Sequence, residues 1–202
     1  MGTNRTSLVQ QRQAPLRDRY AKAPADARIF DGAQTLNACS GDAFHGSVVP
    51  ANAAGVPYRF GIHRAVGGDH DLPNPGDLLC TALAACLDST LRMLAEHLGI
   101  RLASLQVTVR AECDVRGCLL VERGVPVGFQ RMHCSVHLRP EGNVEEDKMQ
   151  MLLAAAENSC VVLQTLRSGV TVQTELEAVE TVPADAAPLT PSTQGQDEGL
   201  VV

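Results

Sequence analysis

A long segment at residues 75–98, mostly apolar but interrupted by a few charged residues, constrains the fold of this chain more than any other segment. Asn74 is a good N-cap, Pro75 suits the first helical position, and Asp77 stands three residues after the cap. Gly99 follows the run as a natural C-terminal stop. These signals predict one helix about 36 Å long. It is apolar nearly all round, so we expect a second copy of the chain to cover part of it in a homodimer.

The pattern on either side of this helix predicts an α+β fold with antiparallel sheets. Apolar and polar residues alternate over 105–114 and over 130–139, as in strands with one buried face. Short strands are expected within 27–67, with the best at 56–65. A helix is expected to start at Asn143, with Glu146 in a capping box. After it we expect a short helix over 160–167 that ends at Gly169, and a final strand over 170–182.

Composition excludes several classes of partner. The net charge is −6 and no Lys/Arg cluster is present, which argues against nucleic acid. No uninterrupted apolar run reaches about 18 residues, so we expect no membrane segment. Residues 1–27 are polar and are expected to form an irregular N-terminal arm, and residues 183–202 a disordered C-terminal tail.

The chain has seven cysteines and no secretory signal at its N-terminus. This odd number favours free thiols in a reducing compartment, so we expect a cytoplasmic location. Cys86 and Cys160 each end an alanine-rich helical run, whose small residues let elements approach closely. They therefore suggest a thiol pair that meets in the fold and can close to a disulfide. The alternative is that both are inert core residues.

The other thiols and the histidines are weaker candidates. Cys80, Cys113 and Cys134 fall on apolar faces and are expected in the core. His133 and His137 are four apart on a strand, roughly 13 Å, which is too far to share an ion. A metal clip at Cys113 and Cys118 is conceivable, but no zinc or phosphate-loop motif is present. We therefore expect neither a metal nor a cofactor.

The motifs together resemble the OsmC/Ohr family over residues 28–182. The similar segments are Asn74-Pro75-Gly76-Asp77-Leu78-Leu79 continuing to Ala85-Cys86, then two strands, Ala156-Glu157-Asn158-Ser159-Cys160, and Thr165-Leu166-Arg167-Ser168-Gly169-Val170. The resemblance implies an OsmC-like fold, with the two long helices at the centre of an intertwined homodimer.

The resemblance also implies a function in oxidative stress defence. Peroxidase members reduce organic hydroperoxides with the first cysteine, here Cys86, and resolve the sulfenic acid with the second, here Cys160. The reductant would be a dithiol such as a dihydrolipoyl protein. No metal, haem or flavin would be needed, because the thiol pair carries the electrons.

The sequence departs from the peroxidase pattern in two places. Gly76 stands where members usually carry a Glu after Asn-Pro, and the Arg that stabilises the thiolate has no clear counterpart. We predict Arg64 in that role, with His45 behind it, and Asp77 orienting Arg64. The alternative role of Asp77 is to stabilise the helix N-terminus. These departures also leave open a non-catalytic OsmC-like dimer that binds a small apolar ligand.

Overall fold

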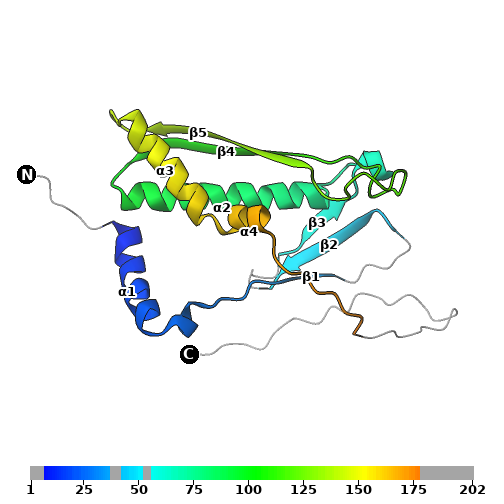
Figure 1. Cartoon of the computed structure of the whole chain (residues 1–202), viewed down its shortest axis with the longest axis horizontal. Helices are drawn as coiled ribbons and strands as arrows, with labels where there is room; N and C mark the ends of the chain where they lie inside the picture. Colours follow the sequence, from blue (N-terminus) through cyan, green and yellow to red (C-terminus); the bar gives the residue numbers. More distant parts are fainter. Residues whose placement is uncertain (1–6, 37–41, 52–55, 178–202) are drawn as a thin grey trace, which may run out of the picture.

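A long central helix, α2 (Pro75–His97), organises the structure, a computed structural model that describes residues 7–36, 42–51 and 56–177. Strands β4 (Leu102–Glu112) and β5 (Arg131–Pro140) run along one side of α2, and α3 (Glu146–Ser159) and α4 (Val161–Ser168) cross it (Figure 1). The N-terminal part comprises α1 (Leu8–Lys22), the 3₁₀ helix η1 (Pro24–Ala27), β1 (Ala33–Thr35), β2 (His45–Pro50), β3 (Tyr58–Gly61) and the 3₁₀ helix η2 (Arg64–Val66). The predicted α+β class is confirmed.

The start and end of α2 follow the predicted signals. The Asn74 side chain accepts hydrogen bonds from the backbone N–H of Gly76 at 2.8 Å and of Asp77 at 3.2 Å. In return, the Asp77 carboxylate accepts from the Asn74 N–H at 3.0 Å, which completes a capping box. Gly99 has φ of 69°, the left-handed conformation that ends a helix readily with glycine.

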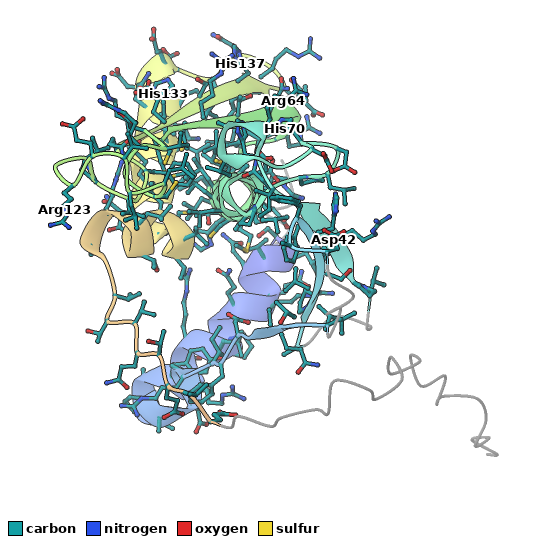
Figure 2. The ribbon with its side chains drawn as sticks, turned by 90° about the vertical axis from the view of Figure 1, so that its right-hand side faces the viewer. Asp42, Arg64, His70, Arg123, His133 and His137 are labelled. Atoms are coloured by element: carbon teal, nitrogen blue, oxygen red, sulfur yellow. The ribbon has the colours of Figure 1, made fainter. Side chains whose placement is uncertain are left out.

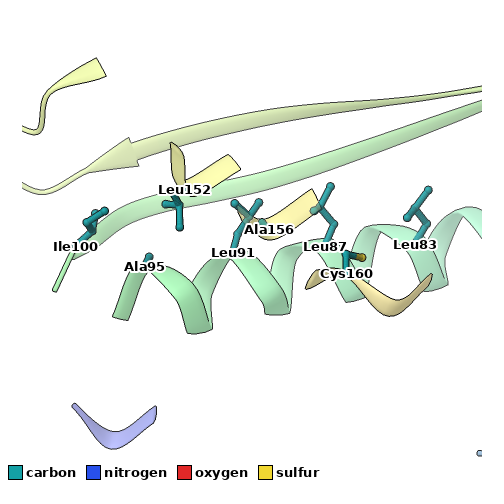
Figure 3. Packing of buried hydrophobic residues seen from close by; sticks show 8 residues of the cluster. All are labelled: Leu83, Leu87, Leu91, Ala95, Ile100, Leu152, Ala156 and Cys160. Carbon is teal, nitrogen blue, oxygen red and sulfur yellow. The ribbon is translucent and has the colours of Figure 1, made fainter. Parts of the chain in front are cut away.

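One face of α2 forms the centre of the core. Leucines four residues apart on α2 point to the side of the helix on which β4, β5 and Leu152 of α3 lie (Figure 3). Because residues at i and i+4 share a helix face, this spacing presents a continuous apolar stripe. The buried cluster consists of Leu83, Leu87, Leu91, Ala95, Ile100, Leu152, Ala156 and Cys160.

The opposite face of α2 is poorly covered within one chain. By length and composition α2 is apolar enough to cross a membrane, a test that core helices also pass. Only 28% of its most apolar window is buried. Ala82 and Ala85 are exposed, and Met93 is 41% exposed. Within one chain α2 is therefore buried on one side only, and the apolar surface on its other side remains exposed.

Two antiparallel sheets account for the strands. β4 pairs with β5 in the register Val107↔Val136 and Val109↔Cys134, so the inward rows of both strands face α2. A separate sheet has the order β1-β2-β3. The predicted strands at 105–114 and 130–139 are confirmed with small shifts. The expected strand at 56–65 is shorter, because Arg64–Val66 turns into η2.

The ends of the chain differ from the expectation. Residues 8–22 are helical rather than irregular, because Ser7 and Gln10 form a capping box that starts α1. α1 contacts the end of α2 through the Gln10 side chain, which donates to the His97 carbonyl at 3.0 Å. Residues 170–177 form no strand; Val172 and Leu176 are about four-fifths exposed, so the chain offers them no neighbouring edge to pair with. Residues 178–182 and the expected tail at 183–202 lie outside the described residues.

The predicted start of α3 is also wrong. The N-cap is Glu145 rather than Asn143, and no side chain caps the helix. The bend at Gly142, with φ of 75°, precedes the helix, whose N-cap lies two residues later than predicted, so Glu146 becomes its first residue rather than the partner in a capping box. The short helix after it matches the prediction, with Gly169 at its end.

His45 ties the N-terminal sheet to the segment before α2. Its Nδ1 lies 2.8 Å from Asp42 Oδ2 and its Nε2 lies 3.0 Å from Asp71 Oδ1. Hydrogen bonds to Asp71 and then Asp42 raise the pKa of His45. The pKa of Asp71 is lowered chiefly by its bond to His45, and that of Asp42 by the Phe44 N–H and then by His45.

We expect this link to make stability depend on pH. The raised pKa of His45 gives stabilisation that is complete below its ordinary value of 6.5 and is lost as pH rises through the raised value. The lowered pKa values of Asp42 and Asp71 give stabilisation that is complete above 3.8 and is lost as pH falls through the lowered values. Thermal melts of His45→Ala should therefore show a small loss relative to the unmodified protein near pH 5 that shrinks above neutrality. The control is His137→Ala, which removes an exposed histidine on the outer row of β5. A stability loss in His45→Ala that is the same at every pH would contradict the ionic link.

Candidate functional site

The fold brings Cys86 and Cys160 together. Cys86 lies on α2 and is half-buried, and Cys160 stands between α3 and α4 as the N-cap residue of α4 and is fully buried. Because α3 and α4 both pack on α2, the break between them falls beside the α2 thiol, and Cys86 lies close enough to Cys160 to raise the pKa of its thiol. Such proximity is the first requirement for a pair of thiols that closes to a disulfide.

Burial and the N-terminus of α4 have opposite effects on the pKa of the Cys160 thiol. Burial raises the pKa of the Cys160 thiol, and its interaction with Cys86 raises it further. The backbone N–H groups of Leu163 and Val162, at the start of α4, act in the opposite direction because they donate to the sulfur. The net effect raises the pKa of Cys160 above its ordinary value of 9.0, so this thiol is protonated at neutral pH.

The structure does not bring Arg64 or His45 to this pair. Arg64 is exposed in η2, before α2, where it lies in the same segment as His70 (Figure 2). Within the described ranges no ion pair joins Arg64 to a carboxylate, and the His45 ring is engaged by Asp42 and Asp71. The Asp77 carboxylate is used in the capping box of α2. The catalytic roles of Arg64 and Asp77 stay predictions.

Phe129 packs over Gly76, the position that carries no side chain. A Cβ atom at Gly76 would lie 2.9 Å from Phe129 Cζ and 2.9 Å from the Asn74 Oδ1 that caps α2. A carboxylic side chain there would therefore displace the aromatic ring or weaken the cap. The absence of the acid at this position is thus part of the packing around the helix start.

Two cavities lie near the start of α2, and Phe129 borders both. The larger, about 790 Å³, lies between β5, α2 and the α3–α4 corner. Its walls include Leu87, next to Cys86 in sequence, and Leu163, whose N–H reaches the Cys160 sulfur. Its residues are Leu79, Leu83, Leu87, Gly128, Phe129, Gln130, Arg131, Met132, His133, Cys134, Val136, Leu153, Glu157, Leu163, Leu166 and Arg167.

The smaller cavity, about 680 Å³, is bordered by Cys80, Cys113 and Cys118. Burial raises the pKa of Cys80, as does the charge of Asp77. Cys113 and Cys118 are exposed, and Cys118 donates to the Val115 carbonyl at 3.2 Å, so Cys113 is not the core residue that its alternation predicts. In the described part of the chain no group of three or more His, Cys, Asp or Glu side chains is arranged to hold a metal ion. Cys39 lies outside that part.

Three features of this region have no counterpart among the predicted site residues, although Cys134 is predicted as a core residue. They are Phe129 over Gly76, the ion pair between Arg167 Nη2 and Glu157 Oε2 at 3.0 Å, and Cys134 in the wall of the larger cavity. Glu157 and Arg167 stand ten residues apart on different helices, so no periodicity within one element brings them together. The available signal was that both belong to the segments that resemble the family.

Comparisons with known proteins agree with this architecture. The structure of an organic hydroperoxide resistance protein from Legionella pneumophila has a TM-score of 0.52 and 20% identity, covering 70% of this chain and 91% of that one. The corresponding protein from Elizabethkingia anophelis has a TM-score of 0.52 and 22% identity, covering 71% and 91%. An OsmC-like protein of unknown function from Vibrio cholerae has a TM-score of 0.58 and 8% identity, covering 68% and 94%. At these identities the similarity shows a shared fold.

A family profile gives the assignment. The profile described as OsmC-like protein matches residues 68–175, which is more than half of the chain. No curated protein matches the sequence. The matched segment begins just before α2 and ends after α4, so it contains both thiols and the larger cavity. The resemblance seen in the motifs is confirmed, and the chain belongs to the OsmC-like protein family.

Proposed function

We propose that this protein is a thiol-dependent peroxidase that reduces organic hydroperoxides through Cys86 and Cys160. The observation that carries the proposal is the interaction between the two thiols at the packing of α2 against the α3–α4 corner. The organic hydroperoxide resistance proteins that share the fold, from Legionella pneumophila and Elizabethkingia anophelis, support it. Six free cysteines in the described residues also fit a reducing, cytoplasmic setting.

The reaction follows from the order of exposure of the two thiols. Cys86 is the more accessible and attacks the terminal peroxide oxygen as a thiolate, which breaks the O–O bond and releases an alcohol after protonation. Cys86 is then a sulfenic acid. Cys160 attacks its sulfur, forming the disulfide and releasing water. A dithiol reductant, such as a lipoyl protein, supplies two electrons and two protons and restores both thiols.

A peptide map after oxidation tests this scheme. Reduced protein treated with one equivalent of cumene hydroperoxide should yield a Cys86–Cys160 disulfide, because these thiols are adjacent. The exposed Cys113 and Cys118 serve as internal controls and should stay largely reduced. If Cys86 and Cys160 remain reduced while a known peroxidase reacts under the same conditions, the peroxidase proposal fails.

We also propose that the functional unit is a homodimer. The apolar face of α2 that carries Ala82, Ala85 and Met93 is exposed in one chain, and the equivalent face of a second copy would match it in chemistry. Sedimentation at micromolar concentration should give a mass of about twice 21.5 kDa. A stable monomer under these conditions would contradict the proposal.

A second candidate function is binding of a small apolar ligand without catalysis. The larger cavity favours it, since a volume of about 790 Å³ whose lining includes six leucines is typical of ligand sites. The packing of Phe129 against Gly76, in place of an acid, also fits a protein that does not need activation of Cys86. Loss of peroxide consumption on substitution of Cys86 distinguishes the two functions.

A further inference from the structure

The larger cavity has an apolar floor and a separate polar corner. Leucines from three helices line the floor: Leu79, Leu83 and Leu87 of α2, Leu153 of α3, and Leu163 and Leu166 of α4. Met132 and Val136 of β5 close the opposite wall. Such a lining accommodates a hydrocarbon chain, because the hydrophobic effect favours removing that chain from water.

The polar corner is an ion pair with no net charge. Arg167 on α4 lies 3.0 Å from Glu157 on α3, and both side chains are about half exposed. The Gln164 side chain donates to the Glu157 backbone carbonyl at 2.7 Å, which holds the α3–α4 corner. Arg167 is thus already paired, and an incoming anion would meet the Glu157 carboxylate beside it.

The other cationic groups at this cavity face outward. Arg131 is 81% exposed and lies 3.5 Å from Glu112 on the neighbouring strand. His133 is exposed on the outer row of β5, as Figure 2 shows for both histidines of this strand. Both groups are exposed to solvent, so they contribute little to the binding of an anion inside the cavity.

We infer that this cavity binds a neutral amphiphile, an apolar chain with one uncharged hydrogen-bonding head group, and discriminates against the carboxylate of the same chain. An alcohol head can donate to Glu157 and accept from Arg167 without breaking their pair. A carboxylate would be repelled by Glu157 or would have to displace it from Arg167, and because the pair is only about half exposed, this repulsion is stronger than it would be in bulk water. The inference rests on the second proposed function and gives its ligand class.

Binding of 1-decanol and of sodium decanoate to the full-length protein tests the inference. At pH 8 the decanoate is ionised, so the ligands share an apolar tail and differ in head-group charge. Isothermal titration should show 1-decanol binding at least about tenfold more tightly. In Glu157→Gln the Arg167 guanidinium has no carboxylate partner on Glu157 and can pair with the ligand, so the affinity for decanoate should rise at least about tenfold. Glu141→Gln, which breaks a comparable 3.0 Å pair with Arg101 outside the cavity, should leave both affinities unchanged.

Protection of a thiol locates the bound ligand. Cys134 lines the cavity and Cys113 does not, so 1-decanol should slow alkylation of Cys134 by N-ethylmaleimide without slowing that of Cys113. Equal affinities for the two ligands, or tighter binding of decanoate, would overturn the head-group inference while ligand binding stands. Binding that leaves Cys134 unprotected would overturn the location, and no binding of either ligand would overturn the ligand-binding function itself. None of these measurements involves peroxide, so the peroxidase proposal is judged separately.

Discussion

Replacement of Cys86 with serine is expected to lower the rate of hydroperoxide reduction by at least about a thousandfold, because a hydroxyl group at neutral pH cannot replace a thiolate nucleophile. The fold should survive, since the side chain is half-buried and serine is nearly isosteric. Peroxide consumption with a dithiol reductant measures the effect, and circular dichroism confirms folding. Retention of activity in a folded Cys86→Ser protein would contradict the peroxidase proposal and favour the binding function.

Two matched variants separate the roles of the thiols. Cys113→Ser removes an exposed thiol away from the pair and should leave the rate unchanged. Cys160→Ala should still allow the first step, so Cys86 should accumulate as a sulfenic acid that dimedone traps. Absence of that adduct in Cys160→Ala would contradict the assignment of Cys86 as the thiol that attacks the peroxide.

The parts of the fold that sequence patterns predict well are those determined by local chemistry. The Asn74-Pro75-Gly76-Asp77 segment marks the start of α2 because its cap and its first turn satisfy one another. The alternation of β4 and β5 survives in the structure because one row of each strand packs on α2. In both cases the signal lies within one segment: a cap in the first turn of α2, and the alternation of buried and exposed residues along each strand.

The failures concern segments whose structure depends on other parts of the chain. The alternation at 170–177 resembles that of β4, yet in one chain these residues have no neighbouring strand and form no ladder. The start of α3 depends on the turn at Gly142 rather than on Asn143. α1 carries a weak sequence signal because most of its residues are polar and Pro15 lies inside it, although its Ser7–Gln10 capping box is present in the sequence.

The residues of the candidate site also fall into two groups, those that local sequence predicts and those that only the tertiary structure brings together. Cys86 and Cys160 stand out because each has a distinctive local context and a family resemblance. Phe129 packs against Gly76 from 53 positions away, and Arg167 and Glu157 meet only because α3 and α4 are joined by a sharp corner at Cys160. Contacts of this kind follow from tertiary structure, so a single sequence offers no periodic pattern that marks them.

Leu152→Ala is expected to give the largest loss of stability, about 2–5 kcal/mol, because it empties space at the centre of the core. Leu152 on α3 is 0% exposed and belongs to the same buried cluster as Leu91 of α2 (Figure 3). The melting temperature should fall on the order of 10 °C for a chain of this length. The neighbouring Met151 is 63% exposed, so Met151→Ala on the same helix should change stability by no more than about 0.5 kcal/mol.

The same pair of variants connects the core to the thiol chemistry. Cys160 directly follows α3, so Leu152→Ala, which loosens the contact of α3 with α2, should also slow formation of the Cys86–Cys160 disulfide. Met151→Ala should not slow it. Both melts must use the same chain concentration, because the stability of a dimer depends on it. If Leu152→Ala is no less stable than Met151→Ala, then α3 does not hold Cys160 against α2 through this leucine, and the packing account of how the thiols meet is wrong.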